Sequence, residues 1–276
     1  MKRKVLTLLT LLFALGFVFV FSAQAEAAKL KLNKTKLVLE MSTSERLKLV
    51  DPDDIEEDEE FDSLETDIDD EVDYDVKWTS SNKKVVKVDK AGVLTPVAVG
   101  SAKITAKADG KKYTCKIVVV DYTGMSEEQK KVVSYALQFV GNPYRYGGIS
   151  LTKGADCSGF TYSIYKKFGY KLYHNAYRQM VDTKSVKMKN IQPGDLIFYG
   201  SSKRNCSHVA IYIGNGKVVH ASTESTGIVI SNYKYRKYCG VGRVLDKATY
   251  LDENGNVIDP DSQEVVDTVT QYATSK

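Results

Sequence analysis

The segment GADCSGFTYSIYKKFG, residues 154–169, decides the fold of the C-terminal half of the chain. Large apolar residues recur in it at every fourth position, Phe160, Ile164 and Phe168, which predicts a helix with one buried face. The Asp-Cys-Ser run before them predicts the start of this helix, and the final glycine predicts its end. The pattern therefore places Cys157 in the first turn of a helix.

The sequence predicts another helix before this one and a sheet after it. A helix is expected to begin at Ser126, whose spacing to Gln129 matches a capping box, and to end at Gly141. A short helical piece is expected at residues 176–181. Strands are then expected at residues 195–199, 208–213, 217–222 and 242–245. This order predicts an α+β domain in which N-terminal helices pack on an antiparallel sheet.

The position of Cys157 suggests nucleophilic chemistry. A thiol in the first turn of a helix meets unpaired backbone N–H groups and the positive end of the helix dipole, which predicts a lowered pKa and a populated thiolate. The alternative is a buried cysteine that acts as a small apolar residue. The polar and small residues beside it, Asp156, Ser158 and Gly159, make a poor apolar pocket.

Two of the three histidines, His208 and His220, flank one predicted hairpin. A two-residue loop would make Ile211 face His220 and send the two histidines to opposite sides of the sheet. A three-residue loop, residues 214–216, would make Ala210 face His220 and place both histidines on one face, about 7 to 8 Å apart along a diagonal. Only the second register lets one histidine act as a base and the other orient it, as in a catalytic triad.

Further motifs in the same order support this chemistry. They are GNPYRYGG at 141–148, DCSGF at 156–160, GDLIF at 194–198, HVAIYIG at 208–214 and HAS at 220–222. Over residues 128–246 they resemble the NlpC-type cell-wall endopeptidases, a papain-like family. The resemblance implies a cysteine peptidase that cuts peptidoglycan stem peptides, typically between γ-D-glutamate and a diamino acid, with no metal or organic cofactor.

The resemblance also implies roles for individual residues. Cys157 is the expected nucleophile, His208 the base and His220 the polar third member. The Tyr144 hydroxyl is expected to hold the oxyanion together with the backbone N–H of Cys157.

Asp156, Ser158 and His174 are the expected substrate-binding residues. Asp156 has the alternative of capping the helix, and His174 that of an exposed surface residue. Asp195, in the turn before a strand, is expected to be structural.

The N-terminal half predicts a different architecture. Short apolar or alternating runs between residues 30 and 120 are separated by turn residues, which is typical of a small β-sandwich. The segments VKWTSSN at 76–82 and GSAKITA at 100–106 resemble the group-two bacterial immunoglobulin-like domain. Trp78, the only tryptophan, is expected in the sandwich core, with sugar stacking as the alternative.

Charge and the N-terminus predict the location. A basic start, an apolar run from Val5 to Phe21 and the small residues near Ala25 predict a signal peptide, with a membrane anchor as the alternative. The protein is expected to be secreted, associated with the cell wall, monomeric and not inserted in the membrane. Residues 122–246 hold 18 Lys or Arg against 7 Asp or Glu, which suits peptidoglycan and anionic wall polymers. Export argues against nucleic acid as a partner.

An acidic insert, residues 51–75, holds 16 acidic residues and no basic one. Three interpretations stay open, a solvated loop, a calcium site, and a segment that docks on the basic half. The expected division of the chain is a signal peptide at 1–25, an immunoglobulin-like domain at 29–120 with the insert, a linker at 121–125, a catalytic domain at 126–246 and a polar tail at 247–276.

Four cysteines are too few for a fold built on disulfides. Cys206 and Cys239 are expected as separate thiols, with a disulfide as the alternative. A zinc enzyme using Cys157, Cys206, His208 and His220 is a rival interpretation, weakened by the lack of a C-x-x-C or H-x-x-x-H pair. A second rival is a wall-binding protein or adhesin that acts through the immunoglobulin-like domain alone.

Overall fold

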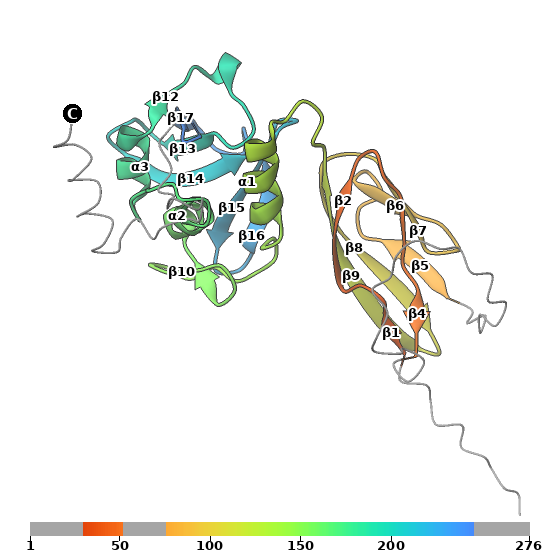
Figure 1. Ribbon diagram of the computed structural model, residues 1–276. Helices are drawn as coiled ribbons and strands as arrows, with labels where there is room; N and C mark the ends of the chain where they lie inside the picture. Colours follow the sequence, from red (N-terminus) through yellow and green to blue (C-terminus); the bar gives the residue numbers. More distant parts are fainter. Residues whose placement is uncertain (1–29, 52–75, 246–276) are drawn as a thin grey trace, which may run out of the picture.

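The computed structural model describes residues 30–51 and 76–245 of the 276-residue chain (Figure 1). The predicted signal peptide at 1–25, the C-terminal tail and all of the acidic insert except Asp51 lie outside the described residues. Within the described ranges, no helix has the length and apolar character needed to cross a membrane.

The N-terminal domain consists of strands in packed sheets, as the alternating runs predicted. A parallel pairing of β2 with β9 joins the antiparallel β9–β8–β5 ladder, and β3, β7 and β6 form a second sheet. The short strands β1 and β4 pair with each other. The bounds are β1 Lys31–Leu32, β2 Lys36–Glu40, β3 Glu45–Arg46, β4 Leu49–Val50, β5 Lys77–Ser80, β6 Val86–Val88, β7 Val93–Pro96, β8 Gly100–Ala108 and β9 Lys111–Val120.

The core of this domain comes from inward-facing residues of both sheets. Ile104 and Ile117 from one sheet and Leu94 from the other are fully buried in a single cluster. Trp78 is partly buried and packs against that cluster, which confirms its expected place in the core. Burial of alternating side chains between two sheets is what holds a sandwich together.

Helix α1, Glu127–Leu137, begins where the capping box predicted. The backbone N–H of Gln129 donates to the Ser126 hydroxyl at 3.3 Å, and the N–H of Ser126 donates to the Gln129 side chain at 2.9 Å. The helix buries Val132, Val133 and Leu137 on one face. A turn follows it up to Gly141, whose φ is +85°, so the helix ends at Leu137, before the predicted end at Gly141.

The C-terminal half, which the sequence predicts to be catalytic, is a layer of helices packed against a sheet. Within the described residues, the strands of this sheet follow the order β12-β17-β13-β14-β15-β16. Helices α2 and α3 contact β14, and Figure 1 shows them beside the middle of the sheet. The bounds are β10 Ile149–Ser150, β11 Gly154–Ala155, α2 Cys157–Lys166, α3 Ala176–Asp182, β12 Lys184–Ser185, the 3-10 helix η2 Met188–Asn190, β13 Leu196–Gly200, β14 Cys206–Tyr212, β15 Lys217–Thr223, β16 Gly227–Asn232 and β17 Tyr238–Arg243.

This half confirms the expected α+β fold and adds strands that were not predicted, β12 and β16 in the large sheet and the separate β10–β11 pair. Strand β16 was not predicted, although residues 227–232 contain an apolar run, Ile228 to Ile230. It pairs with β15 along six residue pairs and forms an edge of the sheet. Asp195 is buried and accepts from Nε and Nη2 of Arg243 at 2.8 and 2.9 Å, which confirms its structural role.

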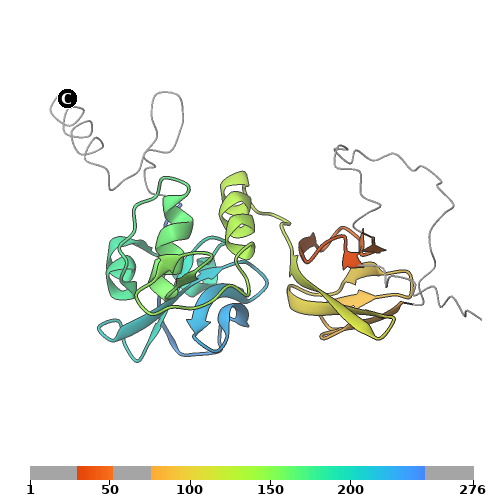
Figure 2. The same ribbon diagram turned by 90° about the horizontal axis from the view of Figure 1, so that it is seen from below.

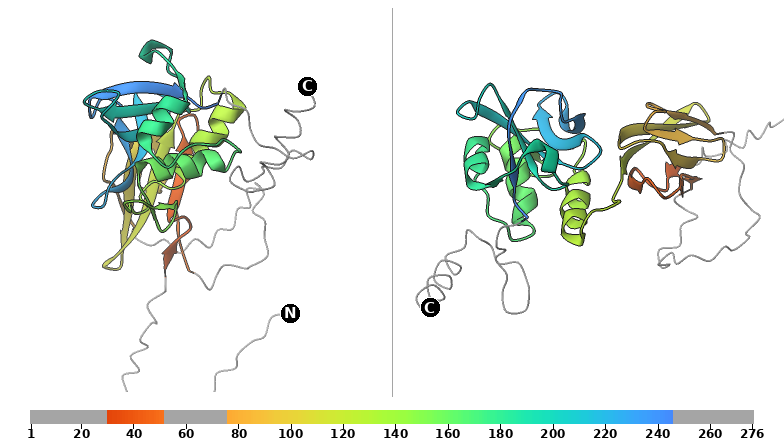
Figure 3. Two further views of the ribbon diagram at one scale, coloured as in Figure 1. Left: turned by 90° about the vertical axis from the view of Figure 1, so that its left-hand side faces the viewer. Right: turned by 90° about the horizontal axis from the view of Figure 1, so that it is seen from above.

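The two halves of the chain pack against each other. Val118 and Val120 of β9 belong to the same buried cluster as Val132 and Leu137 of α1. In the predicted linker, the Asp121 carboxylate accepts from the Asn215 side chain at 3.1 Å, so this segment is a packed turn. Figures 2 and 3 show β9 leading directly into α1, which lies on the side of the sheet nearest the N-terminal domain.

Candidate active site

Cys157 is the first residue of α2, as predicted. Asp156 caps the helix, and its carboxylate accepts from the backbone N–H of Gly159 at 2.7 Å. Phe160 and Ile164 on the apolar face are fully buried and anchor the helix against the sheet. Gly159 has no room for a side chain, because a Cβ would collide with the backbone oxygen of Gly148. Local capping, apolar packing and a small residue together place the thiol at the head of a rigid helix.

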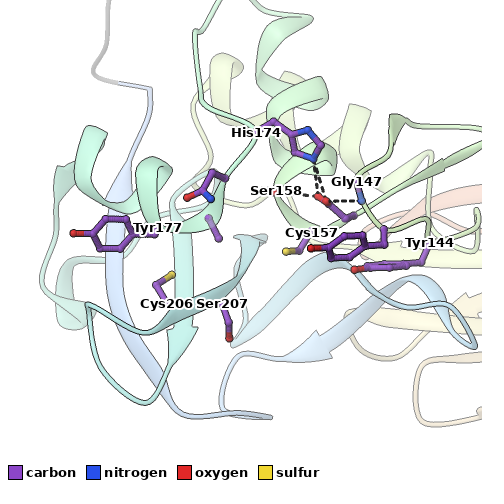
Figure 4. Close-up of a pocket in the computed structure, with 12 residues that line it drawn as sticks. Tyr144, Gly147, Cys157, Ser158, His174, Tyr177, Cys206 and Ser207 are labelled. Carbon is purple, nitrogen blue, oxygen red and sulfur yellow. Dashed lines mark hydrogen bonds and ion pairs between the residues drawn. The ribbon is translucent and has the colours of Figure 1, made fainter.

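The thiol opens into a cavity of about 360 Å³ (Figure 4). Cys157, Ser158, His174, Gly147 and Tyr144 lie close together in the view, with Cys206, Ser207 and Tyr177 further along the hollow. The full lining is Tyr144, Tyr146, Gly147, Asp156, Cys157, Ser158, His174, Asn175, Ala176, Tyr177, Cys206 and Ser207. A concave site of this size with several polar groups suits the binding of a peptide segment.

The hairpin adopts the register that the chemistry requires. Ile211 pairs with Val219, and the N–H of Ile213 donates to the carbonyl of Lys217, so residues 214–216 form a three-residue loop. All three loop residues have positive φ, and two of them are glycines, which adopt such angles without strain. This confirms the three-residue loop.

As a consequence, the two histidines meet. Nε2 of His208 lies 2.8 Å from Nδ1 of His220, and the rings are perpendicular with centroids 5.0 Å apart. His208 is 6% exposed and His220 is fully buried. Because Nε2 of His208 contacts His220, the other ring nitrogen of His208, Nδ1, is the one that can exchange a proton.

Cys157 lies against the strand that carries His208. The backbone N–H of Val209, the residue after His208, acts on the Cys157 sulfur and lowers its pKa. Within the described part of the chain, no hydrogen bond joins this sulfur to the His208 ring itself. Hydrogen bonds between a nucleophile and its base are often long without substrate and shorten in the complex.

Burial determines the charge states of the site. It is the main cause that lowers the pKa of His208 to about 3, with smaller contributions from His220 and Arg236. Burial also lowers the pKa of His220 to about 4, helped by Arg236. Both rings are therefore neutral at pH 7, the state in which an imidazole can accept a proton.

The predicted lowering of the Cys157 pKa is wrong in direction. Burial raises it, and the negative charge of Asp156 adds to the rise, while backbone N–H groups of Val209 and Ser158 oppose it. The helix start supplies the expected N–H donors, but removal of water outweighs them. The resting state is then a neutral thiol and a neutral imidazole, and the proton must move as the thiol attacks.

Asp156 has two roles in the structure. Besides capping α2, it accepts from the backbone N–H of Gly147 at 3.0 Å and from the Ser158 hydroxyl at 3.1 Å. Nε2 of His174 lies 3.0 and 3.1 Å from its two oxygens. His174 is thus an exposed residue that lines the cavity and contacts Asp156, and its role in substrate binding stays a prediction. Ser158 is almost fully buried, so its hydroxyl serves the carboxylate.

Tyr144 stands at the edge of the cavity beside Cys157 (Figure 4). A backbone bridge to Ala155, two residues before the nucleophile, fixes its position. Burial raises the pKa of its phenol, and the proximity of Cys157 raises it further. A protonated hydroxyl is the form that can donate to an oxyanion.

Comparisons with known proteins agree with this geometry. Residues 141–243 match the profile described as the NlpC/P60 family, and residues 63–118 match the profile described as a bacterial Ig-like domain of group 2. The chain is 35% identical over 158 residues to the murein DD-endopeptidase MepS/murein LD-carboxypeptidase of Escherichia coli K12, covering 55% of this chain and 78% of that protein. The chain belongs to the NlpC/P60 family.

Other NlpC/P60 proteins show similar identity over shorter stretches. The chain is 33% identical to the gamma-D-glutamyl-L-lysine dipeptidyl-peptidase of Bacillus subtilis 168, covering 44% of this chain and 41% of that protein. The crystal structure of the NlpC/P60 domain of the peptidoglycan hydrolase SagA is 27% identical, covers 41% of this chain and 97% of that domain, and has a TM-score of 0.39. The expected family, a family of cysteine peptidases, is confirmed, and so is the expected immunoglobulin-like domain.

Sequence analysis missed three residues around the NlpC/P60 histidine pair. The Ser231 hydroxyl lies 2.9 Å from Nε2 of His220, and the ring of Tyr235 lies 4.9 Å from the His220 ring. Arg236 lowers the pKa of both histidines. The apolar run in β16, Ile228 to Ile230, was the sequence signal that could have pointed to Ser231, because the family motifs end before it.

Cys206 and Cys239 are free thiols in contact with each other, as expected for unlinked cysteines. They lie on β14 and β17, on either side of β13, and burial raises the pKa of Cys206 to about 12. Within the described residues, no three or more His, Cys, Asp or Glu side chains are grouped to hold a metal ion, so Cys157, Cys206 and the two histidines do not form the zinc cluster of the rival interpretation.

Proposed function

We propose that the protein is a secreted peptidoglycan endopeptidase in which Cys157 is the nucleophile and His208 the base. The observation that carries the proposal is the buried His208–His220 pair, in which His208 directly precedes Val209, the residue whose N–H lowers the pKa of Cys157. A neutral His208 with Nε2 held by His220 presents Nδ1 for proton transfer. The family and its relatives, whose names describe murein and glutamyl peptidases, support a stem peptide as the substrate.

The proposed reaction proceeds through a covalent intermediate. The Cys157 sulfur attacks the peptide carbonyl carbon while its proton moves to Nδ1 of His208. The backbone N–H of Cys157 and the Tyr144 hydroxyl donate to the oxyanion. The tetrahedral species collapses to a thioester, and the leaving amine takes the proton from His208. Water then attacks the thioester while His208 takes a proton from it. The Cys157 sulfur leaves and takes this proton from His208, and the carboxylic acid product loses its own proton to solvent.

The bond that is cut is proposed to be the one between γ-D-glutamate and the diamino acid. Asp156 and His174 line the cavity beside Cys157 as a polar pair and supply hydrogen-bonding groups for a charged stem peptide. The domain at 29–120 is proposed to keep the catalytic domain, 126–246, at the wall. Export by the segment at 1–25 and contact with anionic wall polymers belong to the same proposal.

Mass spectrometry of muropeptides tests this function. Purified peptidoglycan and soluble stem peptides are digested with the parent protein and with Cys157→Ala. The expected products carry a new amine on the diamino acid and a new γ-carboxyl on glutamate, and Cys157→Ala yields none. Products with other new termini would refute the assigned bond, and equal cleavage by Cys157→Ala would refute the mechanism. Binding to the wall without cleavage by the parent would favour the adhesin.

A further inference from the structure

His220 has a second polar neighbour, on a strand that the proposed mechanism does not use. Strand β16 pairs with β15 so that Val229 faces His220 and Ser231 faces Val218, two positions along. The Ser231 hydroxyl lies 2.9 Å from Nε2 of His220. Because the other ring nitrogen, Nδ1, faces His208 at 2.8 Å, both nitrogens of this fully buried ring have protein partners.

The proton positions along this chain of groups decide whether His208 can act as a base. A neutral imidazole carries one proton, on either Nδ1 or Nε2. If Nδ1 of His220 carried it, this N–H would donate to Nε2 of His208 and leave the proton of His208 on Nδ1. That nitrogen could then not accept the proton of Cys157.

The opposite arrangement works. Nε2–H of His208 donates to Nδ1 of His220, and Nδ1 of His208 keeps a free electron pair. The proton of His220 is then on Nε2, where it needs an acceptor inside the protein. The hydroxyl oxygen of Ser231 occupies that position.

We propose that Ser231 is a positioning residue whose hydroxyl oxygen accepts the Nε2–H of His220. The contact satisfies the buried N–H of the tautomer in which His208 can take a proton, so the relay runs from Cys157 through two histidines to a serine on β16. The inference rests on the proposed function of Cys157 and His208.

Loss of the serine oxygen selectively disfavours the productive tautomer. In Ser231→Ala, the Nε2–H tautomer of His220 would have a buried N–H without an acceptor. The Nδ1–H tautomer would have only an unprotonated Nε2 without a donor. An unmet buried donor is the more costly of the two, and one such hydrogen bond corresponds to a change of about ten-fold in the population of the active form. The same bond also stabilises the positive charge that spreads over the pair when His208 is protonated.

Tyr235 provides a contrast within the same cluster. Its hydroxyl lies 3.4 Å from Nδ1 of His220, the nitrogen that already accepts from His208 at the shorter distance. Its ring packs on His220 with a centroid separation of 4.9 Å and an angle of 31° between the planes. Tyr235 therefore contributes packing, and Tyr235→Phe is expected to keep kcat within about two-fold, since a 3.4 Å contact is a weak hydrogen bond.

The kinetic test compares Ser231→Ala with Ser231→Thr, which keeps a hydroxyl and suits a strand. Ser231→Ala is expected to lower kcat by about ten-fold with an unchanged KM, and Ser231→Thr to restore kcat to within about three-fold. Ser101→Ala, at a half-buried serine of β8 in the other domain, is the matched control and should equal the parent. If Ser231→Ala does not fold, Ser231→Val is compared with Ser231→Thr instead. Valine and threonine have the same shape and differ in the hydroxyl.

A spectroscopic test does not depend on turnover. Nitrogen-15 NMR of labelled histidines is tractable because the chain has three of them. The parent should show His220 as the Nε2–H tautomer, and Ser231→Ala should shift it toward Nδ1–H. Unchanged tautomers and unchanged kcat in Ser231→Ala would overturn the inference while leaving the peptidase proposal intact. Full activity of Cys157→Ala would instead refute the proposed function, and the NMR result would still judge the role of Ser231.

Discussion

The site contains two polar pairs that have the same kind of side chain in different surroundings. In the first pair, His208 and His220 are almost fully buried and contact each other, and His220 also contacts Ser231. In the second pair, the His174 side chain is 31% exposed and lies 3.0 Å from a carboxylate oxygen of Asp156. Burial without a carboxylate keeps an imidazole neutral and able to accept a proton, whereas a carboxylate neighbour holds a histidine as a hydrogen-bond donor.

The largest expected effect breaks the buried pair. His208→Gln removes the proposed base but keeps a polar side chain of similar size, and we expect kcat to fall by about a thousand-fold. His174→Gln, the matched change on the exposed side, should lower kcat by no more than about ten-fold because it alters hydrogen bonding to Asp156 only. Steady-state cleavage of a stem peptide measures both. Equal losses would show that the two pairs do not differ in function.

The next effect concerns the thiols. Cys157 opens into the cavity and receives backbone N–H groups, whereas Cys115 is fully buried in the N-terminal core and burial raises its pKa to about 11. We expect iodoacetamide to label Cys157 about a hundred times faster than Cys115 at neutral pH. Peptide mass spectrometry over time gives both rates. Labelling of Cys157 should also slow in His208→Gln, and similar rates for the two thiols would contradict the greater access to the Cys157 thiol through the cavity.

A smaller effect separates the two roles of Asp156. Asp156→Ala removes the cap of α2 and is expected to lower the free energy of unfolding by about 1 to 2 kcal/mol. Asp156→Asn keeps a good cap and should lower it by a few tenths of that amount, while removing the charge that faces His174. Urea denaturation measures stability, and KM for the stem peptide reports the charge. If the two variants had equal stability, capping would not be the structural role of Asp156.

The smallest expected effect is the dependence of the free energy of unfolding on pH. The native pKa values of about 3 for His208 and about 4 for His220 lie below the value of about 6.5 expected in an unfolded chain. Between the native and the unfolded pKa values, the unfolded chain binds protons that the native protein does not bind. The contribution of the two histidines to the free energy of unfolding is therefore fully present above about pH 6.5 and is lost as the pH falls. The slope is about 1.4 kcal/mol per pH unit for each such proton.

Urea denaturation at pH 7, 6, 5 and 4 measures this slope for the parent and for the double variant His208→Gln, His220→Gln. The double variant should have a flatter acid profile whatever its absolute stability. An acid slope identical to that of the parent would mean that the buried pair is not the source of the pH dependence.

Elements with strong local signals could be predicted from the sequence. The capping box at Ser126, the spacing of Phe160 and Ile164 and the glycine stops gave helices close to their observed positions. The hairpin register was narrowed to two alternatives, and only the packed sheet selected the one with a three-residue loop. Strand β16 was missed because an edge strand of six residues gives a short pattern, and its pairing with β15 is a nonlocal contact.

The chemical properties of individual site residues also fall into two groups, those that the sequence predicts and those that only the tertiary structure decides. The type and order of the site residues, and with them the family, follow from the sequence, because a nucleophile at a helix start and a base on a later strand are local features. The direction of the Cys157 pKa, the bond between His174 and Asp156 and the contact of Ser231 with His220 were decided by the tertiary structure. Each depends on how much water is removed and which distant side chain fills the space, and both are set only when the helices and the sheet pack together.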